Sequence, residues 1–412
     1  MHNKLVPKLA SKSDCTACSA CVDICPTRSL MYIESHDGFY SIELNRQSCI
    51  QCKKCEKVCP IVSNYCYGNN DISSCTKTYA AWNNDFLVRK GSSSGGVFSA
   101  LAKLFLLNGD YVVGAVIDGF RVKHIITNNI NDLSKLQGTK YLSSNLSGVY
   151  KQVKELLKTN SKVLFSGIPC QVAGLKSFLS ITYPNLYTVD LICGGVPSNV
   201  LVDKFVSNCG GISLRSIYSF RDKNNGWKSK EYKYGLKLLN TNGEIIAYTT
   251  KKNLVINGYG VGFANRASCY RCKFSLLNRN SDITIGDLWG DTKFANQHYN
   301  GVSLVILHNS RLDLKSFNIS FAKINIRNYI PFNYRLCYGI ALKYFSPQRL
   351  LFSLIIKKLN YKYTALIYGL IDDEFNFKLL PYSYKIICYL FSKIENIIIR
   401  NAINRFLSTK KI

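Results

Sequence analysis

The sequence is poor in acidic residues and has no long hydrophobic run. Its 412 residues include 25 Asp and Glu against 53 Lys and Arg, which gives a formal net charge of +28. No stretch of about 18 uninterrupted apolar residues occurs, so we expect no membrane-spanning helix. Residues 1–14 lack the apolar segment and cleavage signal of a secretory signal peptide. We therefore expect a cytoplasmic protein, with peripheral contact at the inner membrane surface as the alternative.

Cysteine is abundant, with 17 residues. Closely spaced cysteines in a protein without a secretion signal are typical of metal ligands rather than disulfides. Eight of them lie within residues 1–63 in two matching runs. These runs are Cys15-x-x-Cys18-x-x-Cys21-x-x-x-Cys25-Pro26 and Cys49-x-x-Cys52-x-x-Cys55-x-x-x-Cys59-Pro60.

The spacing of these runs predicts two [4Fe–4S] clusters. Three cysteines at two-residue gaps wrap a tight loop around one cube, and the fourth, before a proline, ligates the other cluster in two-cluster ferredoxins. The resulting ligand sets are Cys15, Cys18, Cys21 and Cys59 for one cluster, and Cys49, Cys52, Cys55 and Cys25 for the other. A pair of zinc sites is the alternative, but zinc requires neither a third evenly spaced cysteine nor a repeated run.

The rest of the chain divides by composition. Residues 64–78 are polar and rich in Gly and Asn, which predicts a linker. Strand-like and helix-like segments alternate over 79–335, which favours an α/β domain. Within it, 213–250 predicts an antiparallel β section with a turn at 241–243. The expected fold class is α+β: a bacterial-type two-cluster ferredoxin fold, an α/β domain with an antiparallel section, and a helical C-terminal extension.

Several elements of the α/β domain are predicted individually. We expect strands over 111–117, 162–165, 186–192, 282–285 and 302–307, and helices over 94–107 and 147–158. The C-terminal extension, 336–412, is rich in Leu, Ile, Tyr and Lys, and its last part over 381–412 is suited to basic amphipathic helices. These helices would pack back on the domain or present a face to a membrane surface or a partner.

Four further cysteines lie in contexts that favour a second kind of site. Cys170 and Cys193 each follow a predicted strand, whereas Cys269 and Cys272 form a C-x-x-C pair. Strand ends on one side of an α/β sheet are where sites assemble. Two single thiols and one pair supply the four ligands that a tetrahedral metal or a cluster needs. Buried free cysteines are the alternative.

Two glycine-containing loops are candidates for anion binding. The first runs into a predicted helix and contains Ser93, Ser94, Gly95 and Gly96. Small residues let the backbone approach a ligand, and free N–H groups at a helix N-terminus suit a phosphate or pyrophosphate. The second loop is Gly138-Thr139-Lys140-Tyr141, with a cation and a ring that suit a cofactor. A flexible helix cap and an ordinary turn are the alternatives.

Seven segments carry a resemblance to a known family. They are GSSSGGVFSAL (91–101), GTKY (138–141), GIPCQVAGL (167–175), LICGG (191–195), FRDKNNGW (220–227), CYRCKF (269–274) and DITIGDLWG (282–290). In this order they resemble the coenzyme F420 hydrogenase/dehydrogenase beta-subunit family with a ferredoxin-like N-terminal extension, over about residues 10–310. Members include subunits of F420-reducing hydrogenases and dehydrogenases, and a hydroxymethyl chlorophyll reductase is similar.

The resemblance implies that the α/β domain binds FAD and a [4Fe–4S] cluster of its own. The cluster ligands would be Cys170, Cys193, Cys269 and Cys272, and the two glycine-containing loops would help to hold FAD. Lys140 would be a catalytic candidate at the N1/O2 side of the flavin, where positive charge stabilises the reduced anion. Arg221 and Lys223 would line the mouth of the substrate or flavin site, with a solvated β-turn as the alternative.

Together these features predict an iron–sulfur flavoprotein oxidoreductase. A role in polysaccharide biosynthesis is one hypothesis for its function, since some members of the family occur beside genes for surface polysaccharides. Ferredoxin, another redox protein or a partner subunit would exchange electrons with the N-terminal clusters, and FAD with a small organic acceptor. The positive charge fits an acidic partner or a phosphorylated or carboxylated substrate, and we expect no nucleic-acid partner; a lysine-rich, soluble surface is the alternative. A non-catalytic electron-relay subunit is the rival function. No hydrogenase large-subunit motif is present.

Overall fold

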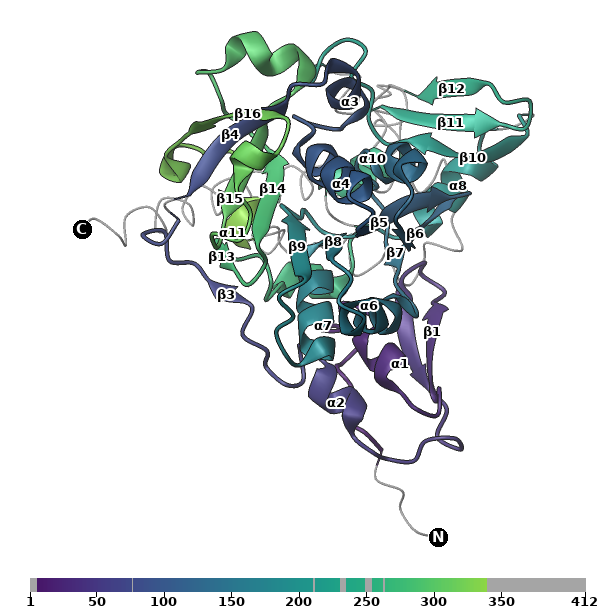
Figure 1. The fold of residues 1–412 in the computed structure, drawn as a ribbon. Coiled ribbons are helices and arrows are strands. Elements are labelled where there is room, and N and C mark those ends of the chain that lie inside the picture. The colour runs from purple at the N-terminus through teal and green to yellow at the C-terminus, as the bar shows by residue number, and fades with distance from the viewer. Residues whose placement is uncertain are drawn as a thin grey trace, which may run out of the picture.

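The computed structural model describes residues 6–75, 77–209, 212–229, 235–248, 254–261 and 264–338. Apart from its first three positions, the predicted C-terminal extension lies outside the described residues. Figure 1 shows the N-terminal part, in purple, beside helices α6 and α7 of the larger α/β part. The mixture of helices and strands agrees with the predicted α+β class.

The N-terminal part is small, and each of its two cysteine runs contains the start of one short helix. It consists of helices α1 (Ala20–Ile24) and α2 (Lys54–Val58) and the antiparallel strands β1 (Leu30–Glu34) and β2 (Tyr40–Leu44). Each helix begins within one of the cysteine runs. The buried side chains Cys18, Ala20 and Val58 pack into the core formed by α6 and α7, so this part is held against the larger one by apolar contact.

A nine-stranded mixed sheet forms the centre of the larger part, in the order β16-β4-β15-β14-β9-β8-β5-β6-β7. Its strands are β4 (Thr78–Asn83), β5 (Tyr111–Asp118), β6 (Arg121–Thr127), β7 (Ser144–Asn145), β8 (Val163–Gly167), β9 (Leu186–Leu191), β14 (Ile283–Asp287), β15 (Ser303–Leu307) and β16 (Ile319–Lys323). Strands β5, β8, β9 and β14 run parallel at the centre. The five predicted strands are confirmed.

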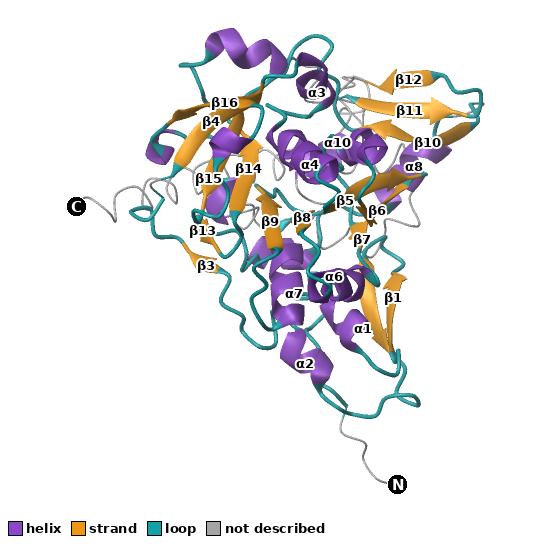
Figure 2. Ribbon diagram, in the orientation of Figure 1, coloured by secondary structure: helices purple, strands orange, loops and turns teal. Residues whose placement is uncertain are grey.

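Helices cover both faces of this sheet, as parallel strands require. Helix α4 (Val97–Leu107) packs on one face, and α6 (Val149–Lys158) and α7 (Pro169–Leu179) pack on the other. Figure 2 shows α4 and the α6–α7 pair on opposite sides of the central strands. Both predicted helices are confirmed, although each begins two or three residues later than its sequence pattern indicates.

A second sheet is antiparallel, as predicted. It contains β10 (Leu214–Ser219), β11 (Leu236–Asn240) and β12 (Ile245–Tyr248), and Gly243 in the β11–β12 turn has a φ of 86°. Helices α8 (Val200–Ser207) and α10 (Leu254–Val261) accompany it. The remaining elements are α3 (Phe86–Gly91), α5 (Leu133–Leu136), α11 (Arg335–Tyr338), β3 (Gly68–Asn69), β13 (Asn278–Arg279), η1 (Ile130–Asp132), η2 (Ala267–Arg271), η3 (Ala295–Asn300), η4 (Leu314–Ser316) and η5 (Ile326–Asn328).

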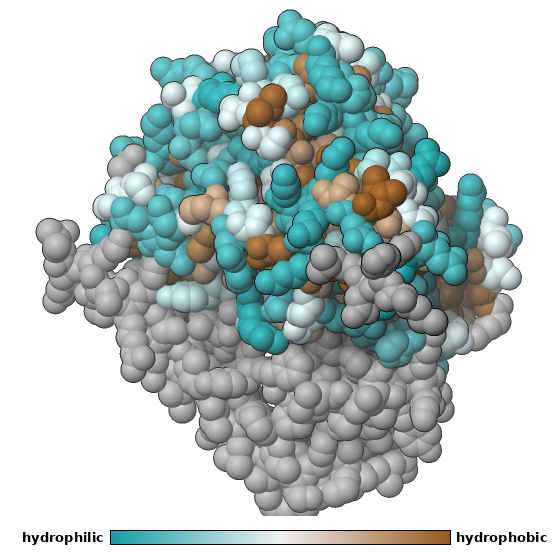
Figure 3. All heavy atoms as spheres, turned by 90° about the horizontal axis from the view of Figure 1, so that it is seen from below, coloured by the Kyte–Doolittle hydropathy of each residue, from teal (hydrophilic) through white to brown (hydrophobic). Residues whose placement is uncertain are grey.

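The surface seen in Figure 3 carries hydrophobic side chains singly or in small groups among hydrophilic ones. Within the described ranges, no helix combines the length and hydrophobicity needed to cross a bilayer.

The segment expected to be a linker is packed against the α/β part. Its strand β3 pairs with β13, and the side chains of Tyr67, Ile72 and Cys75 are buried. Its polar composition is explained by the asparagines at its turns, whose side chains bond to backbone: Asn70 Oδ1 accepts from the Leu277 N–H at 2.8 Å, and Asn69 Oδ1 from the Asp71 N–H at 2.9 Å.

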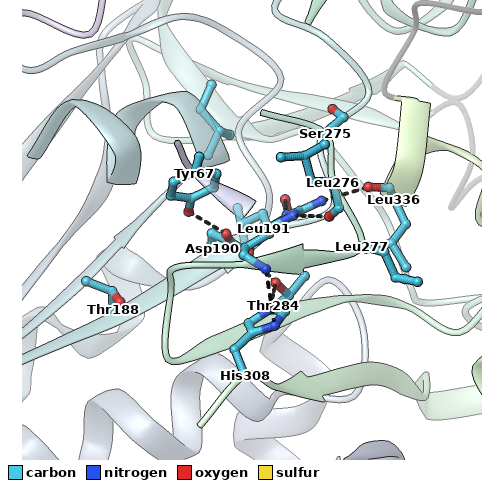
Figure 4. Close-up of polar contacts among 12 residues, drawn as sticks. Tyr67, Thr188, Asp190, Leu191, Ser275, Leu276, Leu277, Thr284, His308 and Leu336 are labelled. Atoms are coloured by element: carbon cyan, nitrogen blue, oxygen red, sulfur yellow. Dashed lines mark hydrogen bonds and ion pairs between the residues drawn. The ribbon is translucent and has the colours of Figure 1, made fainter. Parts of the chain in front are cut away.

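A buried ion pair anchors the same region (Figure 4). Arg279 Nη1 lies 3.0 Å from Asp190 Oδ1, and both side chains are fully buried. The hydroxyls of Tyr67 and Thr284 donate to the same carboxylate at 2.7 and 2.5 Å, and His308 Nε2 lies 2.7 Å from the Thr284 hydroxyl. The carboxylate of β9 is therefore bonded to β13, to β14 and to the 64–78 segment.

A buried histidine links three strands, β6, β7 and β8, towards the β7 edge of the sheet. His124 of β6 contacts the Ser144 hydroxyl through Nδ1 at 2.6 Å and the Ser166 carbonyl through Nε2 at 3.0 Å. The carbonyl can only accept, so Nε2 carries a proton. Burial lowers the pKa of His124 to about 4, so the ring is neutral near neutral pH and Nδ1 accepts from the Ser144 hydroxyl.

Removing the charge of Asp190 is expected to destabilise the fold strongly. The Asp190→Asn protein keeps Arg279 buried without its counter-charge, which costs about 3–5 kcal/mol. Urea unfolding under anaerobic conditions, followed by far-UV circular dichroism, measures the change. As a control, Glu155→Gln removes one partner of an exposed pair with Lys158 and should change stability by no more than about 0.5 kcal/mol. Equal midpoints for Asp190→Asn and wild type would contradict the role of the pair.

Acidification should weaken the fold through His124. Its pKa is about 4 in the folded chain and about 6.5 when unfolded, so the unfolded state binds more protons in this window and stability falls as pH falls. The contribution lost between pH 7.5 and 5 is about 2 kcal/mol. Urea midpoints at both pH values should therefore differ more for wild type than for His124→Asn. The same pH dependence in both proteins would show that His124 does not cause it.

Candidate functional site

The two cysteine runs adopt the same unusual backbone. Ala17 and Ser19 in the first run have φ of 53° and 72°, and Gln51 and Lys53 at the matching positions of the second have 57° and 57°. A left-handed conformation costs a non-glycine residue roughly 1–2 kcal/mol. Four such residues at matched positions indicate loops shaped for something that they enclose.

The cysteines of the first predicted cluster lie together. Burial, together with negative charge on Cys59 and Cys15, raises the pKa of Cys18 to about 12. Burial and the charges of the same three thiols raise the pKa of Cys21. The Ala17 N–H also donates to Cys15 Sγ at 3.4 Å, a contact of the kind that tunes iron–sulfur clusters. Cys59 comes from the second run, as the interleaved assignment predicts.

The other predicted set surrounds a small cavity of its own. Cys25, Cys49, Cys52 and Cys55 all line a cavity of about 20 Å³ at the outer end of the N-terminal part. Cys52 is exposed, and the Ser29 N–H donates to Cys25 Sγ at 3.3 Å. The tertiary structure thus brings the four thiols of each interleaved set together.

A third set of cysteines assembles in the α/β part. Cys170, at the start of α7, and Cys193, after β9, line a cavity of about 30 Å³ together with Cys269 and Cys272. Burial, together with negative charge on Cys193 and Cys272, raises the pKa of Cys269 to about 12. Four partly buried thiols that would repel one another as thiolates are suited to a shared cationic centre, since metal binding requires the deprotonated form.

Two polar side chains at this third cavity carry buried atoms that have no hydrogen-bond partner among the described residues, although Arg266 Nη1 donates to the Tyr40 carbonyl at 2.7 Å. Arg266 is buried, and its Nε and Nη2 make no hydrogen bond; Ser268 Oγ makes none either. Leaving buried donors unsatisfied costs about 1–3 kcal/mol each. A bound anionic group with acceptor atoms would satisfy them, and a [4Fe–4S] cluster with its sulfides has this character. The residues present therefore fit a cluster.

A mononuclear metal fits less well. Within the described residues, no three His, Cys, Asp or Glu side chains are arranged to hold a single metal ion. The thiolates around one zinc ion all lie about 2.3 Å from the same atom. A four-iron cube spreads its four cysteines over four different irons, so its ligands stand farther apart.

The three cysteine sets follow one another in space. Charge on Cys55, of the outer set, contributes to the raised pKa of Cys21, and charge on Cys18 contributes to that of Cys170, in both cases after burial and nearer thiols. The outer set (Cys25, Cys49, Cys52 and Cys55) is thus next to the first set (Cys15, Cys18, Cys21 and Cys59). The first set is in turn next to the third set (Cys170, Cys193, Cys269 and Cys272). Arg266 lies between the first and third sets. Its positive charge lowers the pKa of both Cys15 and Cys269, whereas burial raises them.

A much larger cavity adjoins the third set. It has a volume of about 690 Å³, within the range of ligand-binding sites. Cys193, Gly195 and Val196 line both this cavity and the four-cysteine cavity. It lies at the carboxyl ends of the parallel strands β8, β9 and β14, the edge where α/β sheets bind ligands.

Most of the predicted cofactor-binding residues line this large cavity: Ser93, Ser94, Gly96, Gly138, Thr139, Lys140, Tyr141 and Arg221. The two glycine-containing loops meet, because the Thr139 N–H donates to Ser93 Oγ at 2.6 Å. Gly96 has a φ of 81° immediately before α4, so the turn into the helix favours glycine there.

Two predicted residues lie behind the cavity wall. Gly95 donates its N–H to Ser303 Oγ at 3.0 Å, and a Cβ there would come within 2.5 Å of the Ala81 carbonyl oxygen. Lys223 Nζ donates to the carbonyls of Arg89, Ser94 and Asn300 at 2.7–3.0 Å. Both residues therefore fix the 91–98 loop in place, and neither lines the cavity. The sequence places a cation near the loop but does not show which way it points.

Lys140 lines the cavity, but its ammonium group is engaged elsewhere. Nζ donates to the carbonyls of Lys135, Leu136 and Gln137 at 3.1, 2.9 and 2.7 Å, at the C-terminal end of α5. Burial lowers the pKa of Lys140 to about 7, whereas the three carbonyls favour its charged form. In this arrangement Lys140 closes the end of α5 and shapes the second loop.

Several cavity residues are absent from the sequence prediction. They are His124, Gln171, Tyr259, Asp287, Trp289 and Arg335. Asp287 and Trp289 lie within the DITIGDLWG segment, which is one of the segments that carry the family resemblance. This segment is the sequence signal that could have identified them. Tyr259 and Arg335 come from α10 and α11, outside every quoted motif, and only the tertiary structure brings them to the cavity.

Comparison with known proteins agrees with this architecture. Residues 14–62 match the model of the 4Fe-4S dicluster domain. Two further models describe the coenzyme F420 hydrogenase/dehydrogenase beta subunit. The model of its N-terminal part matches residues 78–151, and the model of its C-terminal part matches residues 160–315.

Two individual proteins are similar to the chain. The coenzyme F420-dependent sulfite reductase of Methanocaldococcus jannaschii is 25% identical over 201 residues, which are 48% of this chain and 30% of that protein. The chain thus spans less than a third of that relative's length. A structure of the F420-reducing [NiFe] hydrogenase complex from Methanosarcina barkeri aligns with a TM-score of 0.41 and 16% identity, covering 62% of this chain and 85% of the matched one.

The matched segments confirm the resemblance predicted from the sequence. The chain belongs to the family of coenzyme F420 hydrogenase/dehydrogenase beta subunits, and it is an iron–sulfur redox protein with a 4Fe-4S ferredoxin-type domain at its N-terminal end.

Proposed function

We propose that the chain is an iron–sulfur flavoprotein oxidoreductase with three [4Fe–4S] clusters and FAD. It would pass electrons between ferredoxin or another one-electron partner and a small organic acceptor. One observation carries the proposal: Cys193 lines both the four-cysteine cavity and the large cavity. A ligand in the large cavity would therefore lie next to a cluster held by Cys170, Cys193, Cys269 and Cys272.

The order of the cysteine sets supports a path for electrons. The outer set, with its exposed Cys52, is accessible to a partner, and the first and third sets lead inward from it to the large cavity. Lys53 and Lys54, at the outer cavity, are exposed and would attract an acidic partner. Each step joins neighbouring sets, so no long transfer is required.

The large cavity has features that suit FAD. The 91–98 loop presents small residues at the N-terminus of the eleven-residue helix α4, where free N–H groups favour a pyrophosphate. Lys223, Ser303 and the Ser93–Thr139 contact hold this loop rigid. When bound, FAD would supply the exchange between one-electron and two-electron chemistry. Tyr141, Tyr259 and Trp289 provide ring surfaces in the same cavity.

The rival function, a relay subunit without its own chemistry, would not need this cavity. A cavity of about 690 Å³ with a ring-lined wall beside a four-cysteine set favours the reductase. Protein purified anaerobically should therefore contain flavin, visible by absorbance after the clusters are bleached. Oxidation of F420, NAD(P)H and reduced ferredoxin is then compared in one preparation. Absence of flavin would reject the reductase, and flavin with no activity towards any donor would favour the relay.

Iron analysis tests the third cluster. With four irons in each cluster, the full chain should contain about 12 irons, and the Cys269→Ser variant about 8. Cys66→Ser is the matched control, because Cys66 is exposed and lines neither of the two cysteine cavities. It should keep the wild-type iron content. A wild-type content of about 8 irons that Cys269→Ser leaves unchanged would exclude the third cluster.

Arg266 should raise the reduction potential of the third cluster. Its charge and its two unpartnered N–H groups favour the more negative reduced form, so Arg266→Gln should lower the midpoint potential, by an amount on the order of tens of millivolts. Arg266→Lys keeps the charge and should lower it less. Redox titration followed by electron paramagnetic resonance measures both. The exposed Arg215, on β10, supplies the control Arg215→Gln, and equal potentials in all four proteins would refute the role.

A further inference from the structure

One wall of the large cavity is a stack of four side chains. The guanidinium of Arg335 lies 5.3 Å from the ring centre of Tyr259, the rings of Tyr259 and Tyr141 stack at 4.4 Å, and Arg221 lies 5.2 Å from the ring centre of Tyr141. All four residues line the cavity. Arg335 belongs to α11, beyond residue 315, where the match to the family ends.

The two arginines of the stack differ in charge balance. Arg221 forms an ion pair with Asp287 at 2.8 Å, and Asp287 also accepts from Trp227 Nε1 at 3.0 Å. Arg335 donates to the Tyr259 hydroxyl at 3.2 Å. Among the residues that the structure describes, no carboxylate lies within 4.0 Å of the Arg335 guanidinium. Within the described part of the chain, Arg335 therefore brings to the cavity a positive charge that no carboxylate pairs with.

The backbone beside Arg335 is adapted to its presence. A Cβ on Gly194 would lie 2.4 Å from Arg335 Nη1 and 2.5 Å from the Tyr259 hydroxyl, so any larger residue at 194 would displace the stack. Gly194 follows Cys193 directly. The guanidinium is thus held against the backbone next to a candidate cluster ligand, at the border of the two cavities.

A guanidinium held in this way is suited to one kind of ligand group. Its planar N–H groups match the two oxygens of a carboxylate or phosphate, and such charge-assisted pairs are stronger than neutral hydrogen bonds. Trp289 and Phe332 also line the cavity, and Trp289 stacks on Trp227 at 4.8 Å with an angle of 6°. The site therefore combines a cation with flat apolar surface.

We propose that Arg335 anchors the carboxylate or phosphate of an aromatic organic acceptor. The inference rests on the proposed function and adds the chemical class of its substrate. The same oxyanion chemistry is present in the pyrophosphate of FAD, for which the 91–98 loop is the alternative holder. The acceptor and the cofactor are therefore the two sources that an experiment has to separate.

Calorimetric titration of the full-length, cluster-containing protein tests the proposal. Phenyl phosphate is the anionic aromatic probe, and benzyl alcohol is its uncharged counterpart. Wild type should bind phenyl phosphate more tightly than benzyl alcohol. Arg335→Gln should weaken phenyl phosphate binding by about tenfold or more, because one charge-assisted pair is lost. The affinity of Arg335→Lys for phenyl phosphate should lie between those of wild type and Arg335→Gln. The exposed control Arg215→Gln should bind phenyl phosphate as tightly as wild type.

Flavin content, measured on the same preparations, separates the two sources. Equal flavin per chain in wild type and Arg335→Gln is expected, and a clear loss of flavin in the variant would assign Arg335 to the cofactor and overturn the proposal. Failure of wild type to bind phenyl phosphate, or equal binding by Arg335→Gln, would overturn it as well. Flavin-free wild type would instead overturn the proposed function, while calorimetry would still measure the dependence on Arg335.

Discussion

The ion pair between Asp190 and Arg279 is the constraint on which the site depends. Both side chains are fully buried, so neither charge is stable in this core without the other. Asp190 lies on β9, three residues before Cys193, and Arg279 lies on β13, seven residues after Cys272. The pair therefore joins the strand end and the C-x-x-C segment that supply three of the four thiols of the third set. Tyr67, from the 64–78 segment, completes the carboxylate's bonds and draws the N-terminal part into the same network.

Local strain and charge repulsion surround the cysteines. Left-handed residues such as Ala17 and Gln51 are unfavourable on their own, and four thiols crowded into a buried cavity would repel one another once ionised. The unpartnered donors of Arg266 add a further cost. At the third cavity, a bound iron–sulfur cluster would offset the last two features together, because it would supply cations to the thiolates and acceptors to the donors of Arg266. The chain around the third cavity is thus arranged for a bound group.

The large cavity shows where prediction from sequence reached its limit. Ser93, Gly96 and Thr139 line one cavity, whereas their sequence context is compatible with a flexible helix cap and an ordinary turn as well as with binding loops. The positive charge of Lys140 and Lys223 favours a role at the cofactor, yet both residues direct Nζ to backbone carbonyls. A lysine side chain is long and flexible, so its position along the chain does not determine where its charge lies.

The sequence by itself determined the cysteine sets, the alternation of strands and helices, and the family. These features depend on spacing and periodicity, which are local properties of the chain. Only the tertiary structure decided that Cys193 lines both the four-cysteine cavity and the large cavity, and that Arg335 lines the large one. Such meetings depend on how the strands order in the sheet and on buried pairs between distant segments. Residues that meet this way carry no common spacing that a single sequence could reveal.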